Sequence, residues 1–217
     1  MCTLIVRTGR ELTLMGVRDE FADRPWEGPG EHWPDDYPGV IGGRDLKAGG
    51  TWLAVNPAAR RAAALLNGHG KPADETTKVS RGDLALRAAY TGEGPGADLS
   101  RYDPFHLVLA DLGEVRMWSW NGERLTTAPL PAGTSMVVNS GLDPESERVA
   151  AYLPRFRAAE DWSEFATEPP SGDRGALIIR HEMPDGRVFA SLSVMRVSIA
   201  PEGVTYDFTD LTADQDR

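Results

Sequence analysis

The sequence predicts an α+β protein with antiparallel sheets and helices on their outer faces. Runs of apolar and β-branched residues give about ten strands against three helices, and the strands cluster at both ends of the chain. Turn signals such as Asn121-Gly122 and Asp185-Gly186 join neighbouring strands directly, as in antiparallel hairpins. Strands that are grouped in this way, apart from the helices, favour α+β over a parallel α/β sheet.

The strands are expected where β-rich runs lie between glycine, proline or asparagine. The first two runs, over 3–7 and 11–17, flank Thr8-Gly9-Arg10 and are expected to form a hairpin. The other predicted strands cover residues 49–56, 61–67, 105–112, 115–120, 135–139, 175–181, 187–199 and 204–208. The segment between the second and third strands, 21–43, is rich in Pro, Gly and Trp and is expected to be a long loop.

Two helices have recognisable start signals. Ser80 stands three residues before Asp83 at the head of SRGDLALRAAY. Asp143-Pro144-Glu145 places Asp at an N-cap and Pro at the first helical position. Three apolar residues then fall on one face of this second helix: Val149, Leu153 and Phe156.

The chain is expected to form a single domain over 1–209, with 210–217 as a flexible acidic tail. The net charge of −10 argues against binding to nucleic acid or to an anionic membrane surface. No apolar run approaches the roughly 18 residues of a membrane span, and no signal peptide is evident. A single cysteine forms no intrachain disulfide, so a cytoplasmic protein is expected.

The only cysteine, Cys2, directly follows the initiator methionine. One interpretation is a small buried hydrophobe in an N-terminal strand. The other is a nucleophile: once Met1 is removed, the thiol stands beside a free α-amine, whose pKa of about 7.7–8.0 suits a general base. In the predicted hairpin, Arg18, Asp19 and Glu20 lie at the same open edge, within about 7 Å of this thiol. Strand alternation puts Arg18 and Glu20 on one face and Asp19 on the other.

A series of motifs resembles the NRDE-motif proteins, the family whose eukaryotic members are called transport and Golgi organisation proteins. The motifs, in family order, are MCTLIVR, GVRDEFADRP, GGRDLKAGGTWLAVN, AALLN, SRGDL, PFHLVLADL and VNSGLD. The resemblance implies an N-terminal-nucleophile hydrolase-like fold, a four-layer αββα sandwich similar in layout to the bile-salt hydrolase and penicillin acylase group. It implies catalytic roles for Cys2, Arg18 and either Asp19 or Glu20. Asn139 is the nearest match to the oxyanion-hole asparagine, and Asn67 is a weaker candidate.

Two positions depart from the family pattern. Val17 stands where the motif has asparagine. The YGTR-like stretch of the last third is VFASLS here, over 188–193, and it contains no arginine. Arg187 and Arg196 are the candidates to substitute for it from a shifted register. Family members are linked to haem handling and to lipid or acyl-CoA homeostasis.

Trp26 and Trp52 are candidates for the wall of a substrate pocket over Cys2, with core packing as the alternative. The four histidines lack metal-ligand spacing, so no metal site is expected, and no cofactor is required. The first functional hypothesis is a hydrolase of a non-peptide amide bond that acts on a small molecule. The alternative is a carrier of a hydrophobic small molecule such as haem or an acyl-CoA-like lipid. A structural protein in which Cys2 belongs to the core is the third interpretation.

Overall fold

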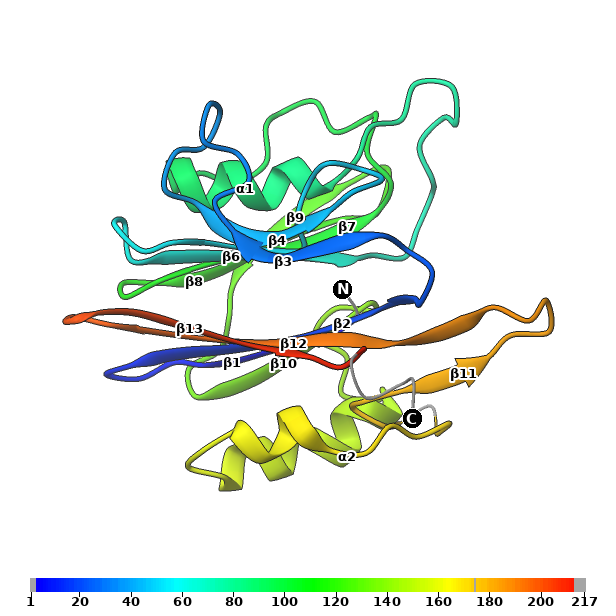
Figure 1. Cartoon of the computed structure of the whole chain (residues 1–217). Coiled ribbons are helices and arrows are strands. Elements are labelled where there is room, and N and C mark those ends of the chain that lie inside the picture. The colour runs from blue at the N-terminus through cyan, green and yellow to red at the C-terminus, as the bar shows by residue number, and fades with distance from the viewer. Residues whose placement is uncertain (1–2, 174, 213–217) are drawn as a thin grey trace.

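The computed structural model describes residues 3–173 and 175–212, and it is a four-layer αββα sandwich. Two antiparallel sheets pack face to face. Helix α1 (Gly82–Thr91) covers the outer face of one sheet and helix α2 (Glu147–Ala158) the outer face of the other (Figure 1). This confirms the expected α+β class and the layered arrangement. Neither α-helix in the described ranges is long and apolar enough to cross a membrane.

All strand pairs in both sheets are antiparallel. The six-stranded sheet has the order β10 (Thr134–Val138), β1 (Thr3–Arg7), β2 (Leu12–Phe21) and β12 (Val188–Ala200), and β12 also pairs with β11 (Arg180–Glu182) and β13 (Gly203–Asp210). The seven-stranded sheet has the order β3 (Trp26–Gly30), β4 (Ile41–Asp45), β5 (Leu53–Asn56), β6 (Arg61–Asn67), β7 (Phe105–Asp111), β8 (Val115–Trp120) and β9 (Leu125–Pro129).

Three apolar clusters lie between the four layers. The central cluster joins the two sheets, with Leu4 and Leu14 from one sheet against Leu53 and Val108 from the other. A second cluster packs α1 on its sheet, and a third packs α2 and a 3₁₀ helix (Ser163–Thr167) on the other sheet. Strand alternation explains this arrangement, because strands such as β1, β5 and β7 send successive side chains into two different clusters.

Several predicted elements differ from the structure in extent. The expected loop over 21–43 contains β3 and the first residues of β4, so that prediction is wrong. The second helix begins at Glu147 rather than at Asp143. Asp143 instead forms a turn, in which it accepts hydrogen bonds from Ser140 Oγ at 2.6 Å and from the Glu145 amide at 3.0 Å. Strand β9 had no sequence signal, because all five of its residues are exposed.

Residues 210–212, which the prediction placed in the tail, belong to the described part of the chain. Asp210 is the last residue of β13, and the Leu211 amide donates a hydrogen bond to the Leu192 carbonyl at 3.0 Å. Residues 213–217 lie outside the described part of the chain.

A contact between two glycines joins the loop after β4 to the start of α1. A Cβ atom on Gly50 would lie 2.6 Å from the Gly82 backbone. We therefore expect Gly50→Ala to lower the free energy of unfolding by about 1–3 kcal/mol, because backbone atoms cannot yield as a flexible side chain would. Gly28→Ala is the matched control, since no atom lies within 4 Å of its added Cβ. Urea denaturation measures both, and equal stability of the two variants would contradict the role of the contact.

Candidate functional site

The charged residues Arg18, Asp19 and Glu20 lie inside strand β2, not at the end of a hairpin. The strand continues to Phe21 because β12 pairs with it along this whole stretch. Arg18 and Asp19 are only 2% and 4% exposed. Strand alternation separates them as expected: Arg18 and Glu20 line one cavity, and Asp19 lines a different hollow.

A register shift in β12 supports this division. Asp19 pairs with Ser191 and Arg18 pairs with Ser193, so Leu192 is the extra residue of a β-bulge. Ser191 and Ser193 are two residues apart, and in a regular strand they would face the same side. The bulge instead places one beside Asp19 and the other beside Arg18.

A buried ion pair fixes the beginning of β1. Arg148 of α2 lies 3.0 Å from Asp19 Oδ2 and donates a hydrogen bond to Thr3 Oγ1 at 2.7 Å. On the other side, Ser191 Oγ donates to Asp19 Oδ1 at 2.6 Å and accepts from the Ile179 amide at 3.0 Å. These bonds connect three strands and α2 around Thr3. Because a buried charge without a partner is costly, the pair also fixes how α2 docks on the sheet.

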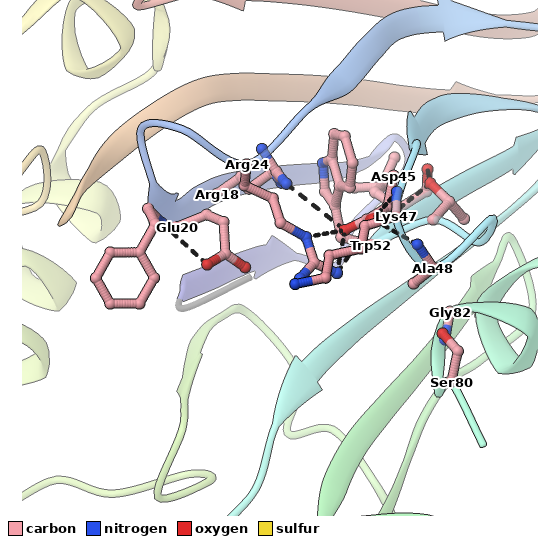
Figure 2. Close-up of polar contacts among 12 residues, drawn as sticks. Arg18, Glu20, Arg24, Asp45, Lys47, Ala48, Trp52, Ser80 and Gly82 are labelled. Carbon is pink, nitrogen blue, oxygen red and sulfur yellow. Dashed lines mark hydrogen bonds and ion pairs between the residues drawn. The ribbon is translucent and has the colours of Figure 1, made fainter. Parts of the chain in front are cut away.

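The larger cavity, of about 460 Å³, is lined by residues from β2 of one sheet and from β4 and β6 of the other, several of which Figure 2 shows. The Arg18 guanidinium carbon lies 4.2 Å from the centre of the Trp52 ring, and its Nη2 lies 3.9 Å from Asp45 Oδ2. Stacking on an aromatic face stabilises a cation that has little contact with water. The lining is mainly charged and polar: Arg18, Glu20, Arg24, Asp45, Ala48, Gly50, Thr51, Trp52, Leu65, Asn67, Lys78, Val79, Ser80, Arg81, Gly82 and Asp103.

Asp45 organises one wall of this cavity. Arg24 donates two hydrogen bonds to its carboxylate, at 2.9 and 3.1 Å, and the amides of Lys47 and Ala48 donate two more. Burial alone would raise the pKa of the Asp45 carboxyl, but these bonds together hold it below its ordinary value. Asp45 is therefore a fixed negative charge that orients both arginines (Figure 2).

The smaller hollow, of about 340 Å³, is lined by Asp19, Asn139 and Arg148, among others. Asn139 follows β10 directly, and its backbone carbonyl lies 3.2 Å from His106 Nε2 on β7. The other ring nitrogen, Nδ1, lies 2.8 Å from Ser119 Oγ. His106 thus connects the seven-stranded sheet to Asn139, which stands just after β10 of the six-stranded sheet.

The predicted site residues that the structure describes fall into three groups. Arg18, Glu20, Asn67 and Trp52 line the larger cavity. Asp19 and Asn139 line the smaller hollow. Trp26 lines neither; it packs edge-on against Trp52 and contacts Phe208 in the core. Cys2 lies outside the described residues.

Sequence reasoning missed Arg148, the cation beside Asp19. The two candidates for the absent family arginine are engaged elsewhere. Arg187 pairs with Asp185, and Arg196 pairs with Asp161 and Asp207. Arg148 stands 129 residues from Asp19 in the chain, and no local motif connects the two. The sequence placed Arg148 in the first turns of a predicted helix, but it gave no indication that this helix lies beside Asp19.

The sequence matches the protein family described as "Transport and Golgi organisation 2" over residues 1–171. Among solved structures, penicillin V acylase from Agrobacterium tumefaciens is similar, with 14% sequence identity and a TM-score of 0.49. That match covers 97% of this chain and 86% of the acylase chain. No curated protein matches the chain significantly in sequence.

We expect the Asp19–Arg148 pair to be strongly coupled. Arg148→Met should lower the free energy of unfolding by about 3 kcal/mol, because it removes the Arg148 cation from the buried Asp19 charge. Asp19→Asn should destabilise the Arg148→Met variant less than it destabilises the wild type. A double-mutant cycle should therefore give a coupling energy of about 1–3 kcal/mol.

The exposed pair Arg187–Asp185 is the control for this cycle. Its side chains are 51% and 52% exposed, so Arg187→Met should change stability by less than about 1 kcal/mol. Additive effects of Arg148→Met and Asp19→Asn would contradict the role of the buried pair.

His106 should make stability depend on pH. Burial lowers its pKa below the ordinary 6.5, and the hydrogen bond to the Asn139 carbonyl opposes that shift only in part. The unfolded chain therefore binds the proton first, and stability is lost as the pH falls through the unfolded value toward the folded one. Urea titrations from about pH 7 to about pH 5 should show a steeper loss for wild type than for His106→Gln. Parallel stability–pH profiles for the two proteins would contradict this role of His106.

Proposed function

The chain belongs to the Transport and Golgi organisation 2 family, and from that premise we propose that it hydrolyses a non-peptide amide bond with Cys2 as nucleophile. One observation carries the proposal: the fixed position of Thr3, which is paired with a residue of each neighbouring strand and accepts a hydrogen bond from Arg148. Thr3 follows Cys2 directly in the sequence, so the proposed nucleophile is one residue from a fixed point at the end of the sheet where both hollows open.

The reaction follows from the chemistry of an N-terminal cysteine. After removal of Met1, the α-amine takes the thiol proton, and Sγ attacks the amide carbonyl carbon. The tetrahedral intermediate collapses, the C–N bond breaks, and the leaving nitrogen takes the proton back from the α-ammonium group. Water then attacks the thioester, releasing the carboxylic acid and restoring the thiol.

The surrounding residues have separate roles in this proposal. Arg18 favours the thiolate, since a nearby guanidinium lowers a thiol pKa. The Asn139 side chain donates a hydrogen bond to the oxyanion, with Asn67 as the second candidate for that role. Asp19 is a positioning residue, because Arg148 and Ser191 hold its carboxylate. Glu20, whose Oε1 accepts from the Phe21 amide at 2.9 Å, lies on the cavity side and is the other candidate to orient the α-amine.

The lining of the larger cavity favours this function over a carrier of haem or of an acyl-CoA-like lipid. Pockets for apolar ligands are lined mainly by hydrophobic and aromatic side chains. Here Trp52, Leu65 and Val79 are outnumbered by charged and polar residues. A small polar amide suits this lining better than a haem or a long acyl chain.

Hydrolysis of a panel of small amides tests the proposal. We expect Cys2→Ala to reduce kcat/KM by at least about a thousand-fold, because it removes the nucleophile. Asn139→Ala should lower kcat by about a hundred- to a thousand-fold, because it removes an oxyanion donor while its backbone bond to His106 persists.

The Asn121→Ala variant is the control for general effects of losing an asparagine side chain, since Asn121 caps the turn after β8 and lies in neither hollow. Residual hydrolysis by Cys2→Ala at the wild-type rate would contradict the proposal. A haem absorbance shift in Cys2→Ser, with no hydrolysis by wild type, would favour the carrier.

A further inference from the structure

The larger cavity has a second wall opposite Arg18. It is formed by the segment 78–82, which leads into α1, and by Asp103. The whole lining contains four cationic residues (Arg18, Arg24, Lys78 and Arg81) against three carboxylates (Glu20, Asp45 and Asp103). A local excess of positive charge stands out in a chain with a net charge of −10.

Most of the cations in the lining have a carboxylate partner nearby. Arg24 forms a two-bond pair with Asp45. Lys78 lies 2.8 Å from Glu75 and 3.8 Å from Asp103. Both are thereby neutralised within the protein.

Arg81 differs from these two residues. Its Nη1 donates to the Pro104 carbonyl at 2.6 Å, which holds the side chain in place without neutralising it. Within the described part of the chain, no carboxylate oxygen lies within 4.0 Å of its guanidinium. Burial lowers the pKa of this guanidinium, and the Asp103 carboxylate offsets only part of that shift. A partly buried cation without a paired anion is costly, and an anionic ligand would recover that free energy.

The neighbouring backbone adds to the positive potential. The close contact of Gly50 with Gly82 keeps the first turn of α1 at the cavity wall. The N-terminus of a helix carries a partial positive charge. The first-turn carboxylate, Asp83, accepts a hydrogen bond from Tyr37 at 2.6 Å and does not line the cavity.

We propose that Arg81 binds an anionic group, a carboxylate or a phosphate, of the small molecule that occupies this cavity. Guanidinium groups suit both anions because they offer two parallel N–H donors. That this molecule is the substrate rests on the proposed function. If it is, its scissile amide lies toward β2 and its anionic group lies beside Arg81. The substrate is then an anionic amide such as an N-acylated amino acid.

Binding to the intact Cys2→Ser protein tests the inference separately from catalysis. The probes are N-hexanoylglycine, its neutral carboxamide and inorganic phosphate, and isothermal titration calorimetry gives each Kd. We expect at least one anionic probe to bind at least ten-fold more tightly than the carboxamide. Which anion binds identifies the group that the site accepts.

Three variants assign the preference to Arg81. Arg81→Gln should abolish the preference for the anionic probe over the carboxamide. Arg81→Lys keeps the charge, so it should retain part of the preference and shows that the loss in Arg81→Gln is not a folding defect. Arg124→Gln removes an exposed arginine outside the cavity and should leave it unchanged. Equal binding of charged and neutral probes, or an undiminished preference in Arg81→Gln, would overturn the inference. If the anionic probe binds with the expected preference but the wild-type protein hydrolyses no amide, the result contradicts the proposed function alone.

Discussion

The structure depends on the burial of two opposite charges at consecutive positions of one strand. Arg18 and Asp19 are almost inaccessible to water, and such charges require partners. Strand alternation sends them to opposite faces of the sheet. Each face must therefore supply a partner of its own: Asp45 and Trp52 on the inner side, Arg148 on the side of α2. These requirements fix the loop after β4 and the docking of α2 relative to the same point of β2.

The same constraint explains why both hollows open at one end of the sandwich. Asp45 holds its loop through two backbone amides and attracts Arg24, which closes one wall of the larger cavity. Arg148 connects α2 to Thr3, and His106 connects β7 to the carbonyl of Asn139. The bulge in β12 gives each charge a serine on its own side. The site is thus assembled from both sheets and from α2.

Local patterns predicted most strands and the α+β class, because alternation and turn residues act over a few positions, whereas the four-layer arrangement was predicted from the family resemblance. They failed where the local signal was weak or misleading: β9 is exposed throughout, and β3 lies in a segment whose Pro and Gly content resembled a loop. Arg18, Glu20, Asn67 and Trp52 were predicted and line one cavity. Arg148 was missed because it meets Asp19 only through a contact between segments far apart in the sequence. Arg81 stands in the SRGDL motif, but its bond to the Pro104 carbonyl and its place in the cavity lining are contacts that the motif does not show.

We propose that Cys2, once Met1 is removed, acts as a free N-terminal nucleophile. The intact mass of the protein purified from its natural host tests it most directly. The account predicts a mass lower than that of the full chain by one methionine residue, which would leave the α-amine of Cys2 available as the base. A mass that includes Met1 would contradict it, because the thiol would then have no adjacent amine to accept its proton.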